Sequence, residues 1–175
     1  MTALPTRLTV LPHSRLGARP RMHWPLPHVQ LDQLPPAWAV EDLIKLCLVI
    51  PHVRTKQSRM ASATSHALYL ADAHAAGPPE AFIDGHEFCH IHPLPEASIH
   101  LTLPKFLRDE AVRLGWGERH PIAEGGILTT LVTVYAPRDR QELNTVFGLI
   151  LHSCRFALGE LESLHSEERS LREAH

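Results

Sequence analysis

The sequence predicts a single α+β domain with a mostly antiparallel sheet, a histidine-rich hairpin and helices packed on one face of the sheet. Two neighbouring segments, residues 86–92 and 97–103, alternate polar and apolar residues and are joined by a proline-containing loop, which is the pattern of a β-hairpin. Other segments carry apolar residues at helical spacing. The order strand, hairpin, helix, strand, helix is typical of an antiparallel sheet covered by helices.

The chain begins with a proline-rich segment. Residues 1–36 contain seven of the 15 prolines and four arginines, with no acidic residue before Asp32. Proline fixes the backbone and lacks an N–H donor, so this density prevents a regular helix or a central strand. We expect an arm over residues 1–36, extended or wrapped over the body, then one domain over 37–163 and a polar tail over 164–175 that frays.

The first elements after the arm are predicted from the spacing of apolar residues and from the prolines and glycines that interrupt it. Residues 37–50 have helical spacing, and a proline ends this helix. A short strand is expected over 65–70, and a Gly-Pro-Pro sequence marks 75–79 as a loop. After the hairpin, Pro104 is placed to begin a helix and Gly115 to end it.

The last elements are a strand and a long helix. Residues 127–135 are rich in β-branched side chains and predict a strand. Asp139 and Glu142 then form a D-x-x-E capping signal after Pro137. Apolar residues at helical spacing continue to Leu161, so we expect one long amphipathic helix.

The composition excludes several classes of protein. The chain has 175 residues, of which 44% are apolar and 21% charged, as in ordinary globular domains. Its net charge of −2 argues against a duplex nucleic-acid binder. Apolar runs such as 46–50 are far shorter than the roughly 18 residues of a membrane span, and residues 1–24 lack the apolar region of a secretory signal. We expect a soluble, cytoplasmic protein that binds neither nucleic acid nor a membrane.

Cysteine and histidine give different signals. The three cysteines, Cys47, Cys89 and Cys154, are odd in number, widely spaced and flanked by apolar residues, so we expect buried thiols. Histidine is unusually frequent, with 14 residues against 17 lysines and arginines together. The sequence has no P-loop, no dinucleotide-binding glycine fingerprint and no G-x-S-x-G elbow. Histidine is therefore where we expect chemistry.

The hairpin brings three histidines together. Residues two apart share a face of a strand, so Phe88, His90 and His92 point one way and Glu87 points the other. A loop centred on residue 95 places His90 opposite His100 and makes the three imidazoles neighbours. They could hold a metal through three nitrogens with an open position, or supply a metal-free general base. The third alternative is an open sheet face that simply carries polar side chains.

Two further segments could bind a ligand. Residues 115–121 combine the flat aromatic Trp116 with Arg119 and His120, although this segment could instead be a structural turn with Trp116 at the edge of the core. Where the last strand meets the last helix, Tyr135 supplies a phenol and Arg138 a guanidinium. Arg138 could alternatively only decorate the start of the helix.

Together these segments resemble the fungal luciferase domain family. The matching blocks are His90-Ile91-His92, Ile99-His100-Leu101, Gly115-Trp116-Gly117-Glu118-Arg119-His120-Pro121 and Tyr135-Ala136-Pro137-Arg138. With a helix between the second block and the third, they cover about residues 86–158. Four blocks in order, one of them seven residues long, are far more specific than any single motif.

The resemblance implies a cofactor-independent oxygenase. The family's luciferase adds dioxygen to a 3-hydroxy-2-pyrone with a styryl arm and loses carbon dioxide from a cyclic peroxide. Such chemistry needs a base, an apolar pocket and donors for the developing oxyanions. The residues that the resemblance implies are a base among His90, His92 and His100, enolate stabilisation by His120 or Arg138, and substrate contacts from Trp116, Tyr135, Arg119 and Phe88.

Three functions stay open at this point. The first is the oxygenase, or related enolate chemistry, on a small aromatic or hydroxypyrone-like substrate with dioxygen and no cofactor. The second is a metal-dependent enzyme in which His90, His92 and His100 bind a divalent metal ion. The third is a non-catalytic module that binds a small molecule. A homodimer is compatible with each of them.

Overall fold

The structure is a computed structural model that describes residue 11 and residues 13–161. The tail expected over 164–175 and residues 1–10 and 12 of the arm lie outside the described residues. Among the helices that the structure describes, none is both long and apolar enough to cross a membrane.

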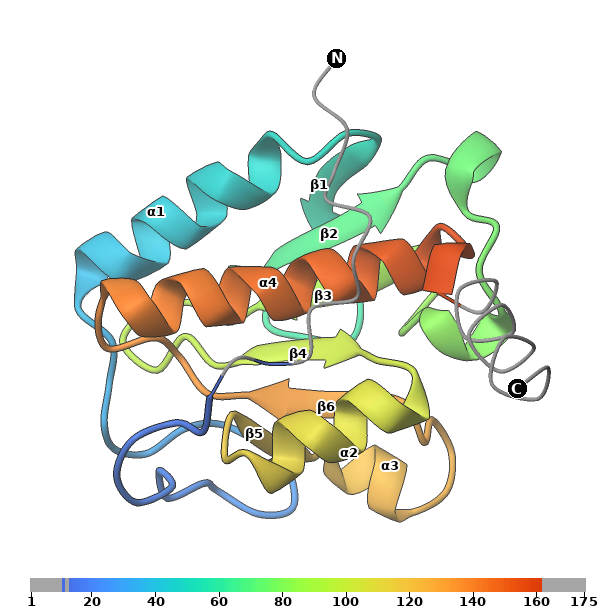
Figure 1. Cartoon of the computed structure of the whole chain (residues 1–175). Helices are drawn as coiled ribbons and strands as arrows, with labels where there is room; N and C mark the ends of the chain where they lie inside the picture. The colour runs from blue at the N-terminus through green and yellow to red at the C-terminus, as the bar shows by residue number, and fades with distance from the viewer. Residues whose placement is uncertain (1–10, 12, 162–175) are drawn as a thin grey trace, which may run out of the picture.

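A six-stranded sheet in the order β1-β2-β3-β4-β6-β5 forms the centre of the molecule, and every neighbouring pair is antiparallel (Figure 1). The strands are β1 (Val53–Gln57), β2 (His66–Leu70), β3 (Glu87–Ile91), β4 (Ile99–Thr102), β5 (Gly117–Arg119) and β6 (Leu131–Val134). The predicted α+β class with an antiparallel sheet is confirmed.

Two long helices cover one face of this sheet. Helix α1 (Ala37–Leu48) and helix α4 (Arg140–Ala157) lie across the strands in Figure 1, and α4 contacts β3 and β4. The shorter α2 (Lys105–Arg113) packs against β5, and α3 (Pro121–Glu124) lies beside β6. As predicted, Asp139 caps α4, because its side chain accepts a hydrogen bond from the Glu142 N–H at 2.8 Å.

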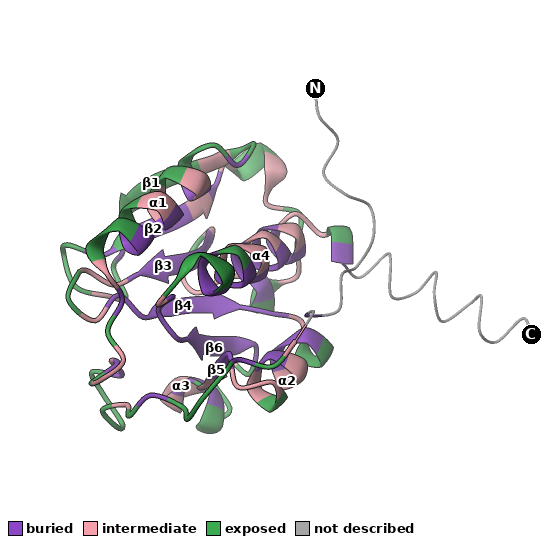
Figure 2. Cartoon of the chain, turned by 60° about the vertical axis from the view of Figure 1, so that its left-hand side comes forward, coloured by how far each residue is buried: buried purple, intermediate pink, exposed green. Residues whose placement is uncertain are grey.

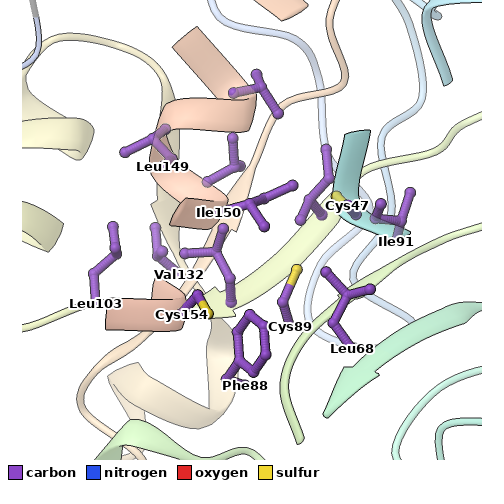
Figure 3. Close-up of a cluster of buried hydrophobic side chains, with 14 of the residues drawn as sticks. Cys47, Leu68, Phe88, Cys89, Ile91, Leu103, Val132, Leu149, Ile150 and Cys154 are labelled. Carbon is purple, nitrogen blue, oxygen red and sulfur yellow. The ribbon is translucent and has the colours of Figure 1, made fainter. Parts of the chain in front are cut away.

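The hydrophobic core lies between the sheet and these two helices. Cys47 of α1, Cys89 of β3 and Cys154 of α4 are among the buried side chains that meet there (Figure 3). Strands β3, β4 and β6 are buried along their whole length, whereas α1 exposes its outer side (Figure 2). Because these strands are buried on both faces, something other than helices must cover the second face.

The arm covers that second face. Residues 13–36 form no helix and only one isolated bridge, between Met22 and Gln30, yet His28 and Gln30 are 1% and 2% exposed. Hydrogen bonds tie the arm to the body at distant points, from Arg15 N to Leu114 O at 2.9 Å and from Arg19 Nη1 to Gly117 O at 3.2 Å. The described part of the arm is therefore wrapped over the body, which is one of the two arrangements that its proline content allows.

The hairpin has the predicted register. His90 pairs with His100, and the His92 N–H donates to the Ser98 carbonyl at 3.0 Å. The apolar residues of β4, Ile99 and Leu101, then face the core, so His100 faces away from the helices.

The predicted alternation fails at the start of β3. Leu68 pairs with Cys89 and the adjacent Tyr69 pairs with Glu87, so Phe88 is an extra residue in the ladder, a β-bulge. Phe88 and Cys89 consequently both join the core, and Glu87 turns to the histidine face. The expectation that Phe88 shares a face with His90, with Glu87 on the opposite face, is wrong for this reason.

Several short elements differ from the sequence prediction. The strand expected over 127–135 begins only at Leu131. The sequence does not predict strands β1 and β5 or helix α3. Most residues of β1 are exposed, so this edge strand lacks the apolar alternation that identifies a strand from sequence. The segment 115–121, for which a structural turn was the alternative to a ligand-binding segment, contains β5 and the start of α3.

Candidate active site: a buried histidine cluster

Five histidines gather on the sheet face that the arm covers, and we call them the histidine cluster. They are His28 of the arm, His90 of β3, His92 just after it, His100 of β4 and His120 at the start of α3. The ring centroid of His100 lies 4.9 Å from that of His90, 4.5 Å from that of His92 and 4.6 Å from that of His120. The ring centroids of His28 and His120 are 5.2 Å apart. The predicted convergence of His90, His92 and His100 is confirmed, and the face is buried rather than open.

A buried carboxylate orients His90. The His90 Nδ1 donates to Glu87 Oε1 at 2.6 Å, and Glu87 is fully buried. Ser58 Oγ and Tyr69 OH also donate to this carboxylate, at 2.9 Å and 2.7 Å. These donors satisfy a charge that would otherwise be costly to bury.

A second carboxylate orients His92. The His92 Nδ1 donates to Glu96 Oε1, and Glu96 Oε2 accepts from Ser98 N at 3.0 Å and from Gln30 N of the arm at 3.2 Å. The opposite ring nitrogen, His92 Nε2, is buried and has no hydrogen-bond partner among the described residues. A buried ring nitrogen without a partner is unusual in a folded protein and needs an explanation.

His100 connects the two halves of the cluster. Its Nε2 donates to the backbone carbonyl of His28 at 3.1 Å, and its Nδ1 lies 3.1 Å from His90 Nε2. On the other side, His120 Nδ1 accepts a hydrogen bond from the Ile122 N–H at 3.2 Å, which caps α3.

His28 brings Glu118 and Tyr135 to the cluster. The Nε2 of His28 is 2.8 Å from Glu118 Oε1 and its Nδ1 is 2.9 Å from Thr133 Oγ1. Tyr135 OH donates to Glu118 Oε2 at 3.0 Å, so the predicted Tyr135 reaches the cluster through a carboxylate. Sequence reasoning missed His28, because it lies far from the hairpin along the chain.

Burial keeps the central imidazoles neutral. Loss of hydration lowers the pKa of His90, holds that of His100 well below its ordinary value and lowers that of His120 to about 4. Neighbouring imidazoles act in the same direction on all three, and Glu87 opposes the effect at His90. At neutral pH each of these rings therefore has one N–H and one lone pair.

Three predicted ligand-binding residues make their contacts elsewhere. Trp116 is 1% exposed within the core, and its Nε1 donates to the His13 carbonyl at 2.8 Å. Trp116 is therefore a core residue, which was the alternative to a ligand contact. Arg119 pairs with Asp109 at 3.1 Å. Arg138 bonds Glu142 and Gln33, which ties the start of α4 to the arm. The structure does not bring these three side chains to the histidine cluster.

An antiparallel sheet with helices on one face and buried, carboxylate-oriented histidines on the other is an α+β architecture suited to acid–base or metal chemistry. Comparisons with known proteins give a family match for this part of the chain. Residues 85–153 match the family model of the luciferase domain. This part of the chain is therefore similar to luciferase domains, in agreement with the resemblance seen in the sequence.

Curated relatives agree with this match. The chain is 29% identical to a luciferase of Armillaria gallica over 155 residues, which cover 78% of this chain and 57% of the relative. It is 37% identical to a luciferase of Armillaria mellea over 67 residues, covering 37% of this chain and 25% of the relative. For a luciferase of Neonothopanus nambi the identity is 35% over 63 residues, covering 34% and 24%. The chain thus spans little more than half of the longest-matched relative, and no solved structure matches it.

Proposed function

We propose that the chain is an oxygenase-type enzyme that reacts a small enolisable molecule with dioxygen at the histidine cluster. The observation that carries this proposal is the set of buried, neutral imidazoles inside the part of the chain that matches the luciferase domain. A site closed off by the arm also suits a reaction whose enolate and peroxide must be protected from water.

His92 is the proton acceptor in the metal-free chain. Glu96 accepts the hydrogen bond from His92 Nδ1, so the neutral ring has its lone pair on Nε2, the nitrogen without a partner among the described residues. A carboxylate that fixes the tautomer of a histidine is a common arrangement for a general base. His92 is also the most exposed ring of the hairpin trio, at 12% for its side chain against 3% for His90.

His120 is placed to stabilise an oxyanion. Its Nδ1 accepts the Ile122 N–H, so its proton is on Nε2. A neutral imidazole N–H can donate to an enolate or peroxide oxygen without giving up its proton. His92 and His120 would thus have complementary roles: His92 would accept a proton, and His120 would donate a hydrogen bond.

The proposed reaction consumes one dioxygen and releases one carbon dioxide per substrate. The hydroxyl O–H of a 3-hydroxy-2-pyrone breaks and its proton goes to His92 Nε2. The enolate gives its electron pair to dioxygen, and the resulting peroxide attacks the ring ester carbonyl. This attack breaks the ring ester C–O bond, cleavage of the O–O bond of the cyclic peroxide then expels carbon dioxide, and the ring-opened product takes back the proton from His92 Nε2.

The test uses a styryl-substituted 3-hydroxy-2-pyrone and measures dioxygen uptake and carbon dioxide release by the chelator-treated protein. We expect uptake above the rate without protein, and a loss of roughly 10²–10⁴-fold in His92→Ala, the usual contribution of a general base. His66→Ala is the control, because His66 is an exposed histidine on neighbouring β2. Uptake no faster than without protein, or equal rates in the two variants, would refute the proposal.

A further inference from the structure

Hydrogen bonds fix which nitrogen bears the proton in His90, His92 and His100. The Nδ1 of His90 faces the Glu87 carboxylate and the Nδ1 of His92 faces the Glu96 carboxylate, so both nitrogens are donors. The Nε2 of His100 faces the backbone carbonyl of His28, which only accepts. In the neutral form of each ring, the lone pair is therefore on the opposite nitrogen.

These three lone pairs converge. The nitrogens of His90, His92 and His100 that could act as ligands all lie within 4.8 Å of one another. His90 Nε2 and His100 Nδ1 are only 3.1 Å apart, a hydrogen-bond distance at which neither neutral ring has a proton to offer. The third, His92 Nε2, is buried without a partner among the described residues. Three lone pairs that face one another repel, so a positive charge between them would stabilise this arrangement.

A divalent cation fits this position better than a proton. An extra proton would create an imidazolium in a buried place, where the loss of hydration disfavours a charged group. Metal ions, by contrast, bind neutral imidazole through its lone pair, while the other ring nitrogen donates to a carboxylate or a backbone carbonyl. All three histidines have that arrangement.

We propose that His90 Nε2, His92 Nε2 and His100 Nδ1 form a binding site for one first-row divalent cation, with Glu87, Glu96 and the His28 carbonyl orienting the ligands. Nitrogens about 2.1 Å from one tetrahedral cation lie roughly 3.4 Å apart. The 3.1 Å between His90 and His100 is close to this spacing, and small ring movements bring in His92.

The alternative trio of His28, His100 and His120 is also compact, with ligand atoms within 4.8 Å. However, both ring nitrogens of His28 are already used, by Thr133 and Glu118. Only the hairpin trio leaves a lone pair on every ring, so the observations favour that trio.

This inference deepens the proposed function, because a cation with an open fourth position could hold the hydroxyl oxygen of the same substrate and make it more acidic. His92 would then be a ligand rather than the proton acceptor, so the metal-bound and metal-free forms would differ in turnover. Binding itself does not depend on the substrate, and it can be measured alone.

The test titrates the chelator-treated full chain with Co²⁺ and Zn²⁺ by calorimetry and records the visible absorption of the cobalt form. We expect one cation per chain and the visible bands of nitrogen-ligated Co²⁺. Glu96→Gln should weaken binding roughly 10–100-fold, as expected when a group that orients a ligand is changed. His92→Ala should abolish the bands, His66→Ala should leave them unchanged, and circular dichroism should show that each variant is folded.

Absence of a stoichiometric site in the wild-type chain would overturn the metal proposal. So would cobalt bands that persist in both His92→Ala and Glu96→Gln, because the ion would then lie on other histidines. The oxygen assay separates the two proposals. If the chain turns over substrate but binds no cobalt, the oxygenase proposal stands and the metal-site proposal fails. If it binds cobalt but turns over substrate in no metal form, the metal-site proposal stands and the oxygenase proposal fails.

Discussion

At the residue scale, the cysteines make a pH-dependent prediction. Burial raises the pKa of Cys47 and Cys154 from 9.0 to about 12 and that of Cys89 well above 9.0. A raised pKa keeps the thiol protonated, so at pH 8 the nucleophilic thiolate is roughly a thousandfold rarer in the folded chain than in the unfolded one.

We therefore expect a disulfide reagent such as dithionitrobenzoate to react very slowly with the native protein at pH 8. The same reagent should titrate all three thiols rapidly in concentrated urea. Following thiol release by absorbance gives both rates. One thiol that reacts as fast in the native protein as in urea would show that it is not buried.

The same scale shows what the sequence could say about the site. Strand parity predicts that His90, His92 and His100 meet, because both hairpin strands keep their alternation there. It cannot predict Glu87, whose side chain reaches the histidines only because of the bulge at Phe88. A bulge adds one residue and reverses the parity of everything before it.

At the scale of elements, the start of α4 depends on its cap. Asp139 accepts the Glu142 N–H at 2.8 Å, and Glu142 in turn accepts the Arg138 N–H at 2.9 Å. Asp139→Ala should lower the free energy of unfolding by about 1 kcal/mol, because a helix N–H loses its acceptor. Asp139→Asn is the matched control and should retain most of the stability, since asparagine caps equally well. Urea denaturation measures both, and equal losses in the two variants would contradict the capping role.

The elements that the sequence predicts well have strongly periodic apolar residues, or proline, glycine or capping residues at their ends. Helices α1, α2 and α4 and the hairpin belong to this group. Strands β1 and β5 do not, because the exposed edge strand β1 presents mostly polar side chains and β5 is only three residues long. Pairing with a neighbouring strand, rather than local pattern, makes these two segments strands.

At the scale of the whole molecule, Gln30 joins the arm to the body. Its side-chain oxygen accepts the Ala136 N–H at 3.0 Å, and its amide donates to the carbonyls of Asp32 and Gln33, both at 2.9 Å. Gln30→Ala leaves the buried Ala136 N–H unpaired, so it should cost about 1–3 kcal/mol.

We expect Gln30→Ala to speed amide hydrogen exchange both in the arm and in the hairpin beneath it. Gln57→Ala, on exposed β1, should leave both segments unchanged. Mass spectrometry of peptides covering residues 20–36 and 88–102 makes the comparison. Faster exchange in the arm alone would mean that the arm does not protect the hairpin.

The arm also bears on how relatives of this chain diverge. The matched luciferase segment, residues 85–153, supplies four of the cluster's imidazoles, yet His28 and the residues that hold Glu87 from the far side, Ser58 and Tyr69, lie outside it. Two proteins could share the whole matched segment and still enclose different volumes above the same histidines. What covers the histidines can therefore change with the unmatched part of the chain, while the histidines of the matched segment stay the same.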